Sequence, residues 1–341
     1  MQKIINVLSG NKEDIAPIWM MRQAGRHLPE YLEVRNTTKS FIDFCFSPEK
    51  AAKVTLQPIH RYDMDAAILF ADILLVPIAL GRTVTFEKGI GPLLNPLSTK
   101  DISNFQINTD VLKPVYETVC KVRKELDNNK TLIGFCGGPW TVATYMLEGK
   151  GTPNKELAKK FAYENEEAIN DLLDYLVAVS AEYLIKQAEA GVDALQIFES
   201  WASDLSPYLF NKLVIVPTKK IIKRIRDAGV NIPIIGFPKN CGLSINEYVK
   251  NSGITAIAVS TETPLDQIRG LIPKNMAIQG NLDPLALRIG GNTLKNQVQE
   301  ILDKVKGPHI FNLGHGVTPD VKIENIKAVI NHIRKGEGNY V

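Results

Sequence analysis

The sequence has few cysteines and no long apolar run. Its 341 residues include only four cysteines, which are scattered along the chain with no CxxC spacing. In a chain of this length, dispersed cysteines are typical of reduced thiols and argue against a disulfide framework. No stretch approaches about 18 consecutive apolar residues, and the first residues, MQKIINVLSGNKEDIAP, lack an apolar segment of signal-peptide length. We therefore expect a cytoplasmic protein with no membrane partner.

A strong charge of one sign is also absent. The net charge is +3 and no dense block of Lys and Arg occurs, which argues against a nucleic-acid partner. The chain contains no HExxH and no His-x-Cys pair, so no metal site is expected. It also lacks GxxxxGK[ST], GxSxG and a GxGxxG after its first apolar run. The common nucleotide-binding loops and the nucleophile elbow of hydrolases are thereby excluded.

What the sequence does contain is a repeated alternation of two patterns. Short, continuous apolar runs are followed by segments with helical periodicity, and such runs suit strands buried on both faces of a parallel sheet. The eight runs are residues 16–21, 65–75, 131–139, 193–200, 232–238, 255–261, 276–284 and 309–316. Eight strands alternating with helices predict an α/β fold, a (β/α)8 TIM barrel, with residues 1–341 as a single domain. An open doubly wound sheet is the alternative.

The segments between the runs give more detailed predictions. Ser47 and Pro48 suit the N-cap and first position of a helix over 47–62. Residues 156–191 read as one long amphipathic helix that ends at Gly191. Residues 81–96 break the alternation and predict a small β-hairpin after the second strand.

Candidate functional residues follow the predicted strands, because barrel enzymes carry their chemistry at the C-terminal strand ends. Arg22 and Arg26 flank Gly25 directly after the first run, an arrangement that suits bidentate binding of a carboxylate or phosphate. Each candidate also has a simpler interpretation: an arginine could form a surface ion pair, and Asp72 could cap the following turn. The other candidates are Tyr145, Glu199, Ser200, Lys239, Thr261, Asn281, Asp283 and His315.

Two further alternatives concern charged side chains at these strand ends. Glu199 and Lys239 could form an ion pair at the rim or contact a ligand. His315 could be an ordinary turn residue, or its two flanking glycines could expose the imidazole to a ligand. From the residues alone, the barrel is expected to bind a polyanionic small molecule without a metal or a nucleotide.

The stretches PIWMMRQAGR and GFCGGPWTVATYMLEGKG resemble the two signature stretches of the uroporphyrinogen decarboxylase family. The pieces ILFADIL, LQIFESWA, IQGNLDP and NLGHGVTPD resemble the same family in its chain order, so that the resemblance extends from about Pro17 to about Asp320. The resemblance implies a carboxy-lyase of porphyrin and haem biosynthesis. Such an enzyme converts the four acetate side chains of uroporphyrinogen III to methyl groups, giving coproporphyrinogen III. It also implies a TIM barrel, no cofactor, and a homodimer in which the two clefts face each other.

The resemblance also implies roles for particular residues. Asp72, Arg22 and Tyr145 would be catalytic, with Asp72 stabilising the transition state. A carboxylate would oppose the eight carboxylates of the substrate unless it faces the ring N–H groups at the centre of the macrocycle. His315 could carry positive charge near neutral pH and help to bind anions. The substrate-binding residues would be Arg22, Gln23, Ala24, Gly25, Arg26, Asp72, Tyr145, Ser200 and His315.

Other interpretations stay open at this point. A non-catalytic tetrapyrrole carrier would need the arginines but would gain little from a central Asp72. A corrinoid methyltransferase-like relative would hold zinc partly through a His-x-Cys pair, which this chain lacks. The sequence does not identify the proton donor, since an arginine, a water or a substrate carboxylic acid could serve. It also leaves open the order of decarboxylation, the isomer selectivity, the dimer strength and whether residues 27–41 close over the substrate.

Overall fold

The computed structural model describes residues 2–87 and 89–335, in which seven parallel strands form one curled sheet. The order of the strands is β1-β4-β5-β6-β7-β8-β9, so each strand after β1 pairs with its predecessor in the sheet. The strands are β1 (Ala66–Ile68), β4 (Thr131–Gly137), β5 (Ala194–Glu199), β6 (Ile234–Pro238), β7 (Ala256–Ala258), β8 (Ala277–Leu282) and β9 (His309–Leu313).

Residues 17–20 complete the ring between β9 and β1. On one side, the Phe311 N–H donates to the Pro17 carbonyl (2.9 Å) and the Trp19 N–H donates to the Phe311 carbonyl (3.3 Å). On the other side, the Asp65 N–H donates to the Ile18 carbonyl (2.9 Å). The predicted barrel is confirmed, but the run 16–21 forms only an isolated bridge at Ile18 instead of a full strand. Pro17 cannot donate to a ladder, and the chain turns directly after residue 20.

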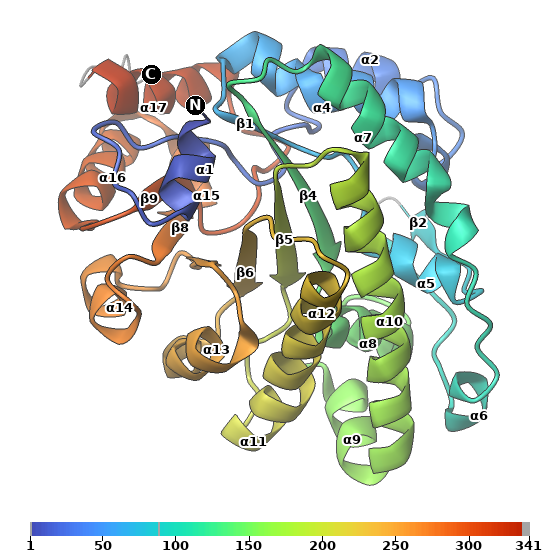
Figure 1. Cartoon of the computed structure of the whole chain (residues 1–341). Helices are drawn as coiled ribbons and strands as arrows, with labels where there is room; N and C mark the ends of the chain where they lie inside the picture. Colours follow the sequence, from blue (N-terminus) through green and yellow to red (C-terminus); the bar gives the residue numbers. More distant parts are fainter. Residues whose placement is uncertain (1, 88, 336–341) are drawn as a thin grey trace.

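Helices surround the sheet (Figure 1). Those before β4 are α1 (Lys3–Leu8), α2 (Pro29–Arg35), α3 (Phe41–Cys45), α4 (Pro48–Tyr62), α5 (Leu75–Ala79), α6 (Thr99–Ile102), η1 (Thr109–Leu112) and α7 (Lys113–Glu125). Those between β4 and β7 are α8 (Pro139–Glu148), α9 (Glu156–Glu164), α10 (Glu166–Ala190), α11 (Pro207–Phe210), η2 (Asn211–Ile215), α12 (Val216–Asp227), η3 (Gly242–Ser244) and α13 (Ile245–Ser252). The remaining ones are α14 (Leu265–Leu271), α15 (Pro284–Ile289), α16 (Gly291–Lys304) and α17 (Ile323–Lys335).

The predictions between the strands are confirmed in part. Helix α4 begins at Pro48 with Ser47 at the N-cap position, although the Ser47 side chain makes no capping hydrogen bond. The hairpin is present as the antiparallel strands β2 (Thr85–Glu87) and β3 (Gly91–Leu93). The single long helix is wrong: it is two helices, α9 and α10, because Asn165 leaves the helical conformation (φ −129°, ψ 66°). Helix α10 does end at Gly191, which is left-handed (φ 117°).

Alternate residues of each strand fill the inside of the barrel. On β6, Ile235 and Phe237 pack into an inner cluster with side chains from the other strands. Between them, Gly236 faces outward, where the Tyr248 ring of α13 would lie 2.6 Å from an added Cβ. The inner cluster includes Ile4 and Val7, so α1 closes one end of the barrel. This end lies at the top of Figure 1.

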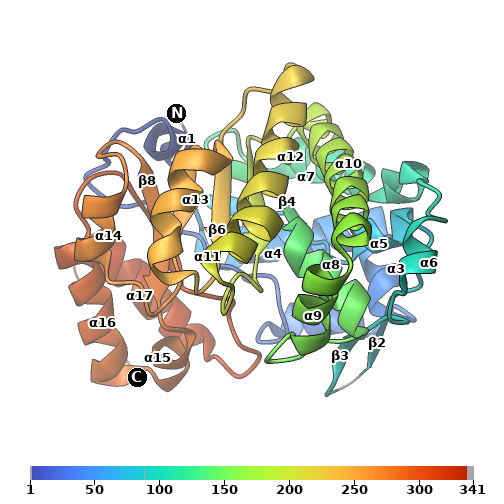
Figure 2. The same cartoon turned by 90° about the horizontal axis from the view of Figure 1, so that it is seen from below.

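The opposite end of the barrel is the one at which the parallel strands finish. The arrows of β4, β5 and β6 point toward α8, α9 and α11 in Figure 1, and Figure 2 views the molecule from that side. We call this C-terminal end the mouth. The predicted site residues lie at the end of a strand, follow a strand or residues 17–20, or, like Tyr145, belong to a helix that begins there, so the barrel topology brings distant parts of the sequence to one end.

Candidate active site

The turn after residues 17–20 carries the first candidate residues. Arg22 adopts a left-handed backbone conformation (φ 61°). The side chain of Gln23 is buried and bound to the backbone: Oε1 accepts from the Met20 N–H (3.0 Å) and Nε2 donates to the Ala66 carbonyl (2.9 Å). A Cβ added at Gly25 would lie 3.0 Å from the Arg22 carbonyl oxygen. The amide of Gln23 therefore ties the turn to β1 and is not directed at a ligand.

The same turn presents positive charge and free donors. Within residues 2–87 and 89–335, the backbone N–H groups of Ala24, Gly25 and Arg26 donate no hydrogen bond. Arg22 and Arg26 are exposed, and neither forms an ion pair with another described residue. Free N–H groups beside two guanidinium groups form an arrangement that binds carboxylates.

Asp72 follows β1 and keeps part of its surface accessible at the mouth. A carboxylate oxygen of Asp72 accepts a hydrogen bond from the Leu74 N–H (2.8 Å), so the residue does cap the following turn. Burial raises the pKa of Asp72 to about 6, although the Leu74 N–H and the charge of Arg22 both favour the carboxylate. Asp72 is therefore ionised at neutral pH and gains from any further hydrogen-bond donor placed against it.

Tyr145 and Ser200 lie at the same end of the barrel. The Tyr145 ring, on α8, packs edge-on against Trp201 with 5.6 Å between ring centroids. Burial raises the pKa of Tyr145, an interaction with Trp201 opposes that change, and the charge of Asp72 raises the pKa further. Asp72 and Tyr145 are therefore electrostatic neighbours. Ser200 follows β5 and is partly accessible.

His315 differs from its prediction. Burial, together with the charges of Arg22 and Lys239, lowers the pKa of His315 to about 3, so the expectation of a positive charge near neutral pH is wrong. The flanking glycines also serve packing. A Cβ at Gly316 would lie 2.3 Å from Cδ of Arg22, and one at Gly314 would lie 2.2 Å from the backbone of the loop after β7. His315 is thus a neutral hydrogen-bonding group beside Arg22.

The barrel places Arg22, Asp72, Tyr145, Ser200 and His315 at its mouth end. Comparisons with known proteins bear on the family. The family model described as uroporphyrinogen decarboxylase (URO-D) matches residues 1–336. The chain belongs to the uroporphyrinogen decarboxylase family. It is 48% identical over 334 residues to the uroporphyrinogen decarboxylase of Maricaulis maris, covering 97% of both chains. It is 47% identical over 341 residues to that of Brucella canis, covering 98% of this chain and 99% of that one.

Solved structures support the fold of this family member. A methyltransferase from Methanosarcina mazei superposes with a TM-score of 0.80 at 19% identity, covering 98% of each chain. A B12-independent methionine synthase from Shewanella superposes with a TM-score of 0.58 at 12% identity, covering 85% of this chain and 86% of that one. At these identities the likeness concerns the barrel fold alone.

Glu199 has a different place from the one predicted for it. The side chain is fully buried at the end of β5, where it accepts hydrogen bonds from the N–H groups of Trp140 (3.3 Å) and Thr141 (2.6 Å). Burial raises the pKa of Glu199 to about 8, although its hydrogen bonds with Thr141 and Trp140 oppose this. Glu199 therefore caps the first turn of α8 and forms no rim ion pair with Lys239. Sequence analysis missed this role because the cap comes from a strand residue 58 to 59 positions away along the chain.

An aromatic layer below the mouth was also missed. Phe135, Phe198 and Phe237, on adjacent strands, pack edge-to-face with centroid distances of 5.4 Å and 6.0 Å. Their spacing follows from strand alternation, which directs every second residue of β4, β5 and β6 inward. The barrel of this family member thus has an apolar aromatic layer beneath its polar mouth.

The described residues offer little for a metal ion. No group of three His, Cys, Asp or Glu side chains among them is close enough to hold a metal ion together. Among the same residues, no helix is long and apolar enough to cross a membrane.

Proposed function

We propose that this protein removes carbon dioxide from the four acetate side chains of uroporphyrinogen III, giving coproporphyrinogen III in porphyrin and haem biosynthesis. Membership of the family supports the reaction. The observation that carries the proposal is the carboxylate of Asp72, which lies at the same mouth as cations that form no ion pair, Arg22 among them. Such an arrangement suits a ligand with carboxylates at its edge and N–H donors at its centre.

The chemistry requires an electron sink for each departing carboxylate. A pyrrole protonated at a ring carbon becomes iminium-like and accepts the electron pair left by carbon dioxide, so the substrate supplies its own sink. Asp72, facing the ring N–H groups, stabilises the positive charge that develops on protonation. Because Asp72 is ionised and already fixed by the Leu74 N–H, little reorganisation is needed when that charge appears.

The other residues bind and orient the substrate in this proposal. Arg22 and Arg26, with the free N–H groups of Ala24 and Gly25, hold carboxylates. Tyr145 lies near Asp72 and orients the substrate macrocycle, while Ser200 and neutral His315 donate hydrogen bonds to the substrate or accept them from it. A guanidinium with a pKa above about 12 is a weak acid, so Arg22 acts through its charge and not as the proton donor.

Two alternatives are not favoured. A tetrapyrrole carrier would be weakened by the repulsion between Asp72 and the substrate carboxylates, with no catalytic gain. A methyltransferase related to the Methanosarcina structure shares only the fold at 19% identity. The relatives at 46–48% identity are named decarboxylases.

Anaerobic turnover of uroporphyrinogen by the purified protein tests the proposal. The expected result is coproporphyrinogen, with intermediates of seven, six and five carboxylates, in the absence of added metal or cofactor. Binding of the substrate without release of carbon dioxide would support the carrier instead. Asp72→Asn, with substrate binding measured separately, distinguishes loss of catalysis from loss of affinity.

We also propose that the protein is a homodimer. Large exposed side chains support this: Leu157 and Tyr163 belong to α9 and Tyr208 to α11. Both helices lie at the mouth end of the barrel (Figure 2). The Tyr163 hydroxyl lies 3.4 Å from Ser206 Oγ, which keeps the two helices adjacent. Light scattering should give twice the chain mass, and Tyr208→Glu should lower it. An unchanged single-chain mass for the wild type would contradict the dimer.

We propose a single domain and a cytoplasmic location as well. One continuous sheet and a family match over 1–336 support the first, and four free cysteines support the second.

A further inference from the structure

Lys239 has a fixed position on the rim of the mouth. It follows β6 directly, and its N–H donates to the Glu199 carbonyl at the end of β5 (3.0 Å). The next N–H, of Asn240, donates to Ser260 Oγ after β7 (2.8 Å). The backbone at Lys239 is therefore held from both neighbouring strands, and only its side chain is free to move.

We infer from strand parity and from its electrostatic neighbours that the Lys239 side chain is directed toward the mouth. Ile235 and Phe237 face inward and Gly236 faces outward, so Lys239 has the inward parity, one step above the aromatic layer. Its electrostatic neighbours are consistent with that direction. Burial lowers the pKa of Lys239, the carboxylate of Glu262 opposes this, and the cations of Arg22 and Lys155 lower it further.

The ammonium group of Lys239 has no partner among the described residues. It is half-buried, yet no hydrogen bond or ion pair joins its Nζ to any of them. Lys155, which is buried nearby, shows what a satisfied lysine looks like in this fold. Its Nζ donates to the hydroxyl (2.9 Å) and carbonyl (3.2 Å) of Ser203 and to Asp204 (3.2 Å). Glu262 favours the charged ammonium without forming an ion pair with it, so a ligand carboxylate bound to Nζ would stabilise this partly desolvated charge further.

Lys239 stands across the mouth from the two arginines. In the ring, β1, β4 and β5 separate residues 17–20 from β6 on one side, and β7, β8 and β9 separate them on the other. Arg22 and Arg26 follow residues 17–20, so β6 holds the opposite wall. A planar ligand bound over the aromatic layer with carboxylates around its whole edge would present some of them to each wall.

We propose that Lys239 binds a substrate carboxylate on the side of the macrocycle opposite Arg22 and Arg26. This assignment rests on the proposed function, because it requires a ligand whose carboxylates span the mouth. Cations on opposite walls hold the ring centred over Asp72. They would also keep it centred as each of the four acetate arms is turned into place.

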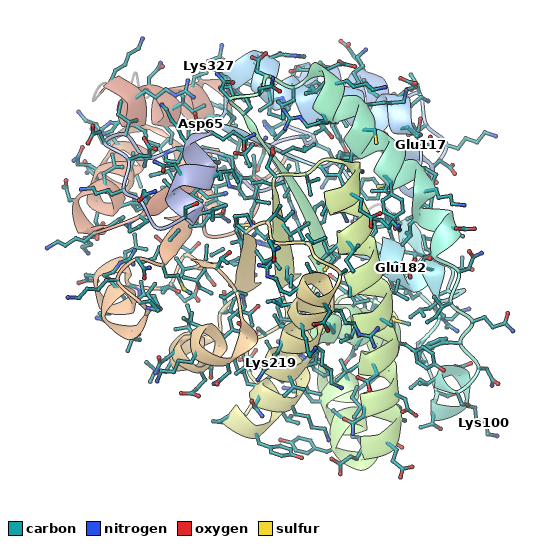
Figure 3. All side chains as sticks on the ribbon, in the orientation of Figure 1. Asp65, Lys100, Glu117, Glu182, Lys219 and Lys327 are labelled. Carbon is teal, nitrogen blue, oxygen red and sulfur yellow. The ribbon has the colours of Figure 1, made fainter. Side chains whose placement is uncertain are left out.

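The test compares Lys239→Met with Lys219→Met, a matched control. Lys219 is exposed on the outer helix α12 and is labelled in Figure 3. Both changes remove one positive charge, but only one removes it from the mouth. Lys239→Met should raise KM for uroporphyrinogen about tenfold and change kcat by less than about threefold, as expected for one charge-assisted hydrogen bond. Lys219→Met should leave both unchanged.

A second ligand separates this assignment from the proposed function. Uroporphyrin, the stable oxidised octacarboxylate, should bind Lys239→Met about tenfold more weakly than the wild type by fluorescence titration. If the wild type binds uroporphyrin but never decarboxylates uroporphyrinogen, the proposed function is wrong. The difference in uroporphyrin affinity between the wild type and Lys239→Met still tests whether Lys239 binds a carboxylate. Lys239→Arg, which keeps the charge, should retain most of the affinity, and it also serves if the Met variant does not fold.

Two results would overturn the assignment. One is a Lys239→Met variant whose KM and uroporphyrin affinity match those of Lys219→Met. The other is an equal loss of affinity in the Met and Arg variants, which would indicate that the side chain acts through packing and not through charge.

Discussion

The two ends of the barrel differ in whether their charged residues form ion pairs within the protein. At the closed end, the carboxylate of Asp63 pairs with Lys130 and with Arg334 (2.8 Å). Asp65, labelled near the top of Figure 3, accepts a hydrogen bond from the Ile18 N–H (2.8 Å) and lies 3.6 Å from Arg334. These contacts link the segment at Ile18, residues 63–65 and the last helix, α17.

At the mouth, Arg22, Arg26 and Lys239 form no ion pair within the described parts of the chain, although Arg22 acts on Asp72 and Glu262 acts on Lys239 through their charges. The one central carboxylate, Asp72, is held at the cost of a raised pKa. The same residue types therefore serve stability at one end and recognition at the other. The difference lies in whether the ion-pair partner is another residue of the protein or a bound ligand.

Asp72→Asn should have the largest effect on the mouth, because it should lower activity and raise stability together. Loss of a preorganised charge should reduce kcat about 100- to 1,000-fold. The raised pKa means that folding is disfavoured as pH rises through about 6, so the neutral variant should be about 1–3 kcal/mol more stable at pH 8. Urea denaturation should show the gain at pH 8 and none below about pH 4, where both forms are neutral. A variant less stable than the wild type at pH 8 would mean that Asp72 is fully satisfied in the free protein.

Arg22→Met should raise KM about 10- to 100-fold and also shift the pH dependence of kcat/KM. The charge of Arg22 lowers the pKa of Asp72, so its removal should raise that pKa above about 6. The acid limb of kcat/KM should then move to higher pH. Arg26→Met is the control: it should raise KM, but because Arg26 does not act on Asp72 the limb should stay in place. Equal shifts in both variants would mean that the acid limb of kcat/KM responds to the total positive charge of the mouth and not to the ionisation of Asp72.

Asp65→Ala should affect only the closed end. It removes the acceptor for the Ile18 N–H, and Ile18 is fully buried, so the free energy of unfolding should fall by about 1–3 kcal/mol. Urea titration measures the loss, while kcat and KM should match the wild type. A tenfold change in KM would show that the two ends are coupled.

His315→Gln should give the smallest change in the pH profile. His315 is neutral above about pH 3, so its protonation contributes nothing between pH 5 and 8. The variant should keep the wild-type acid limb even if its kcat is lower. Disappearance of that limb in His315→Gln but not in Asp72→Asn would assign it to the histidine.

The sequence predicted the barrel well, because continuous apolar runs and glycine-ended helices are local features. It failed where the outcome depends on contacts between distant segments. The break at Asn165 interrupts a periodicity that continues on both sides. The pKa of His315 is lowered first by burial and then by the charges of Arg22 and Lys239, which come from opposite walls. The rim ion pair that was one alternative for Glu199 and Lys239 does not form, since the Glu199 carboxyl accepts hydrogen bonds from the first turn of α8.

Several site roles depended on the family resemblance and not on physical pattern. Ala24, Gly25 and Ser200 have no chemical feature in the sequence that distinguishes them from ordinary turn residues. The structure gives two of them a physical rationale, because the N–H groups of Ala24 and Gly25 are free donors beside the arginines. Backbone donors of this kind are not visible in a pattern of side chains.

The closure of the ring by residues 17–20 has a consequence for folding. The last strand of the barrel, β9, must pair with a segment made at the very start of synthesis, through Pro17 and Phe311. Until β9 has left the ribosome, β8 and the segment at Ile18 remain open edges. Contacts so distant in sequence are slow to form. The nascent chain is therefore exposed to edge-to-edge aggregation for most of its synthesis, and closing the ring both ends that exposure and completes the wall that carries Arg22.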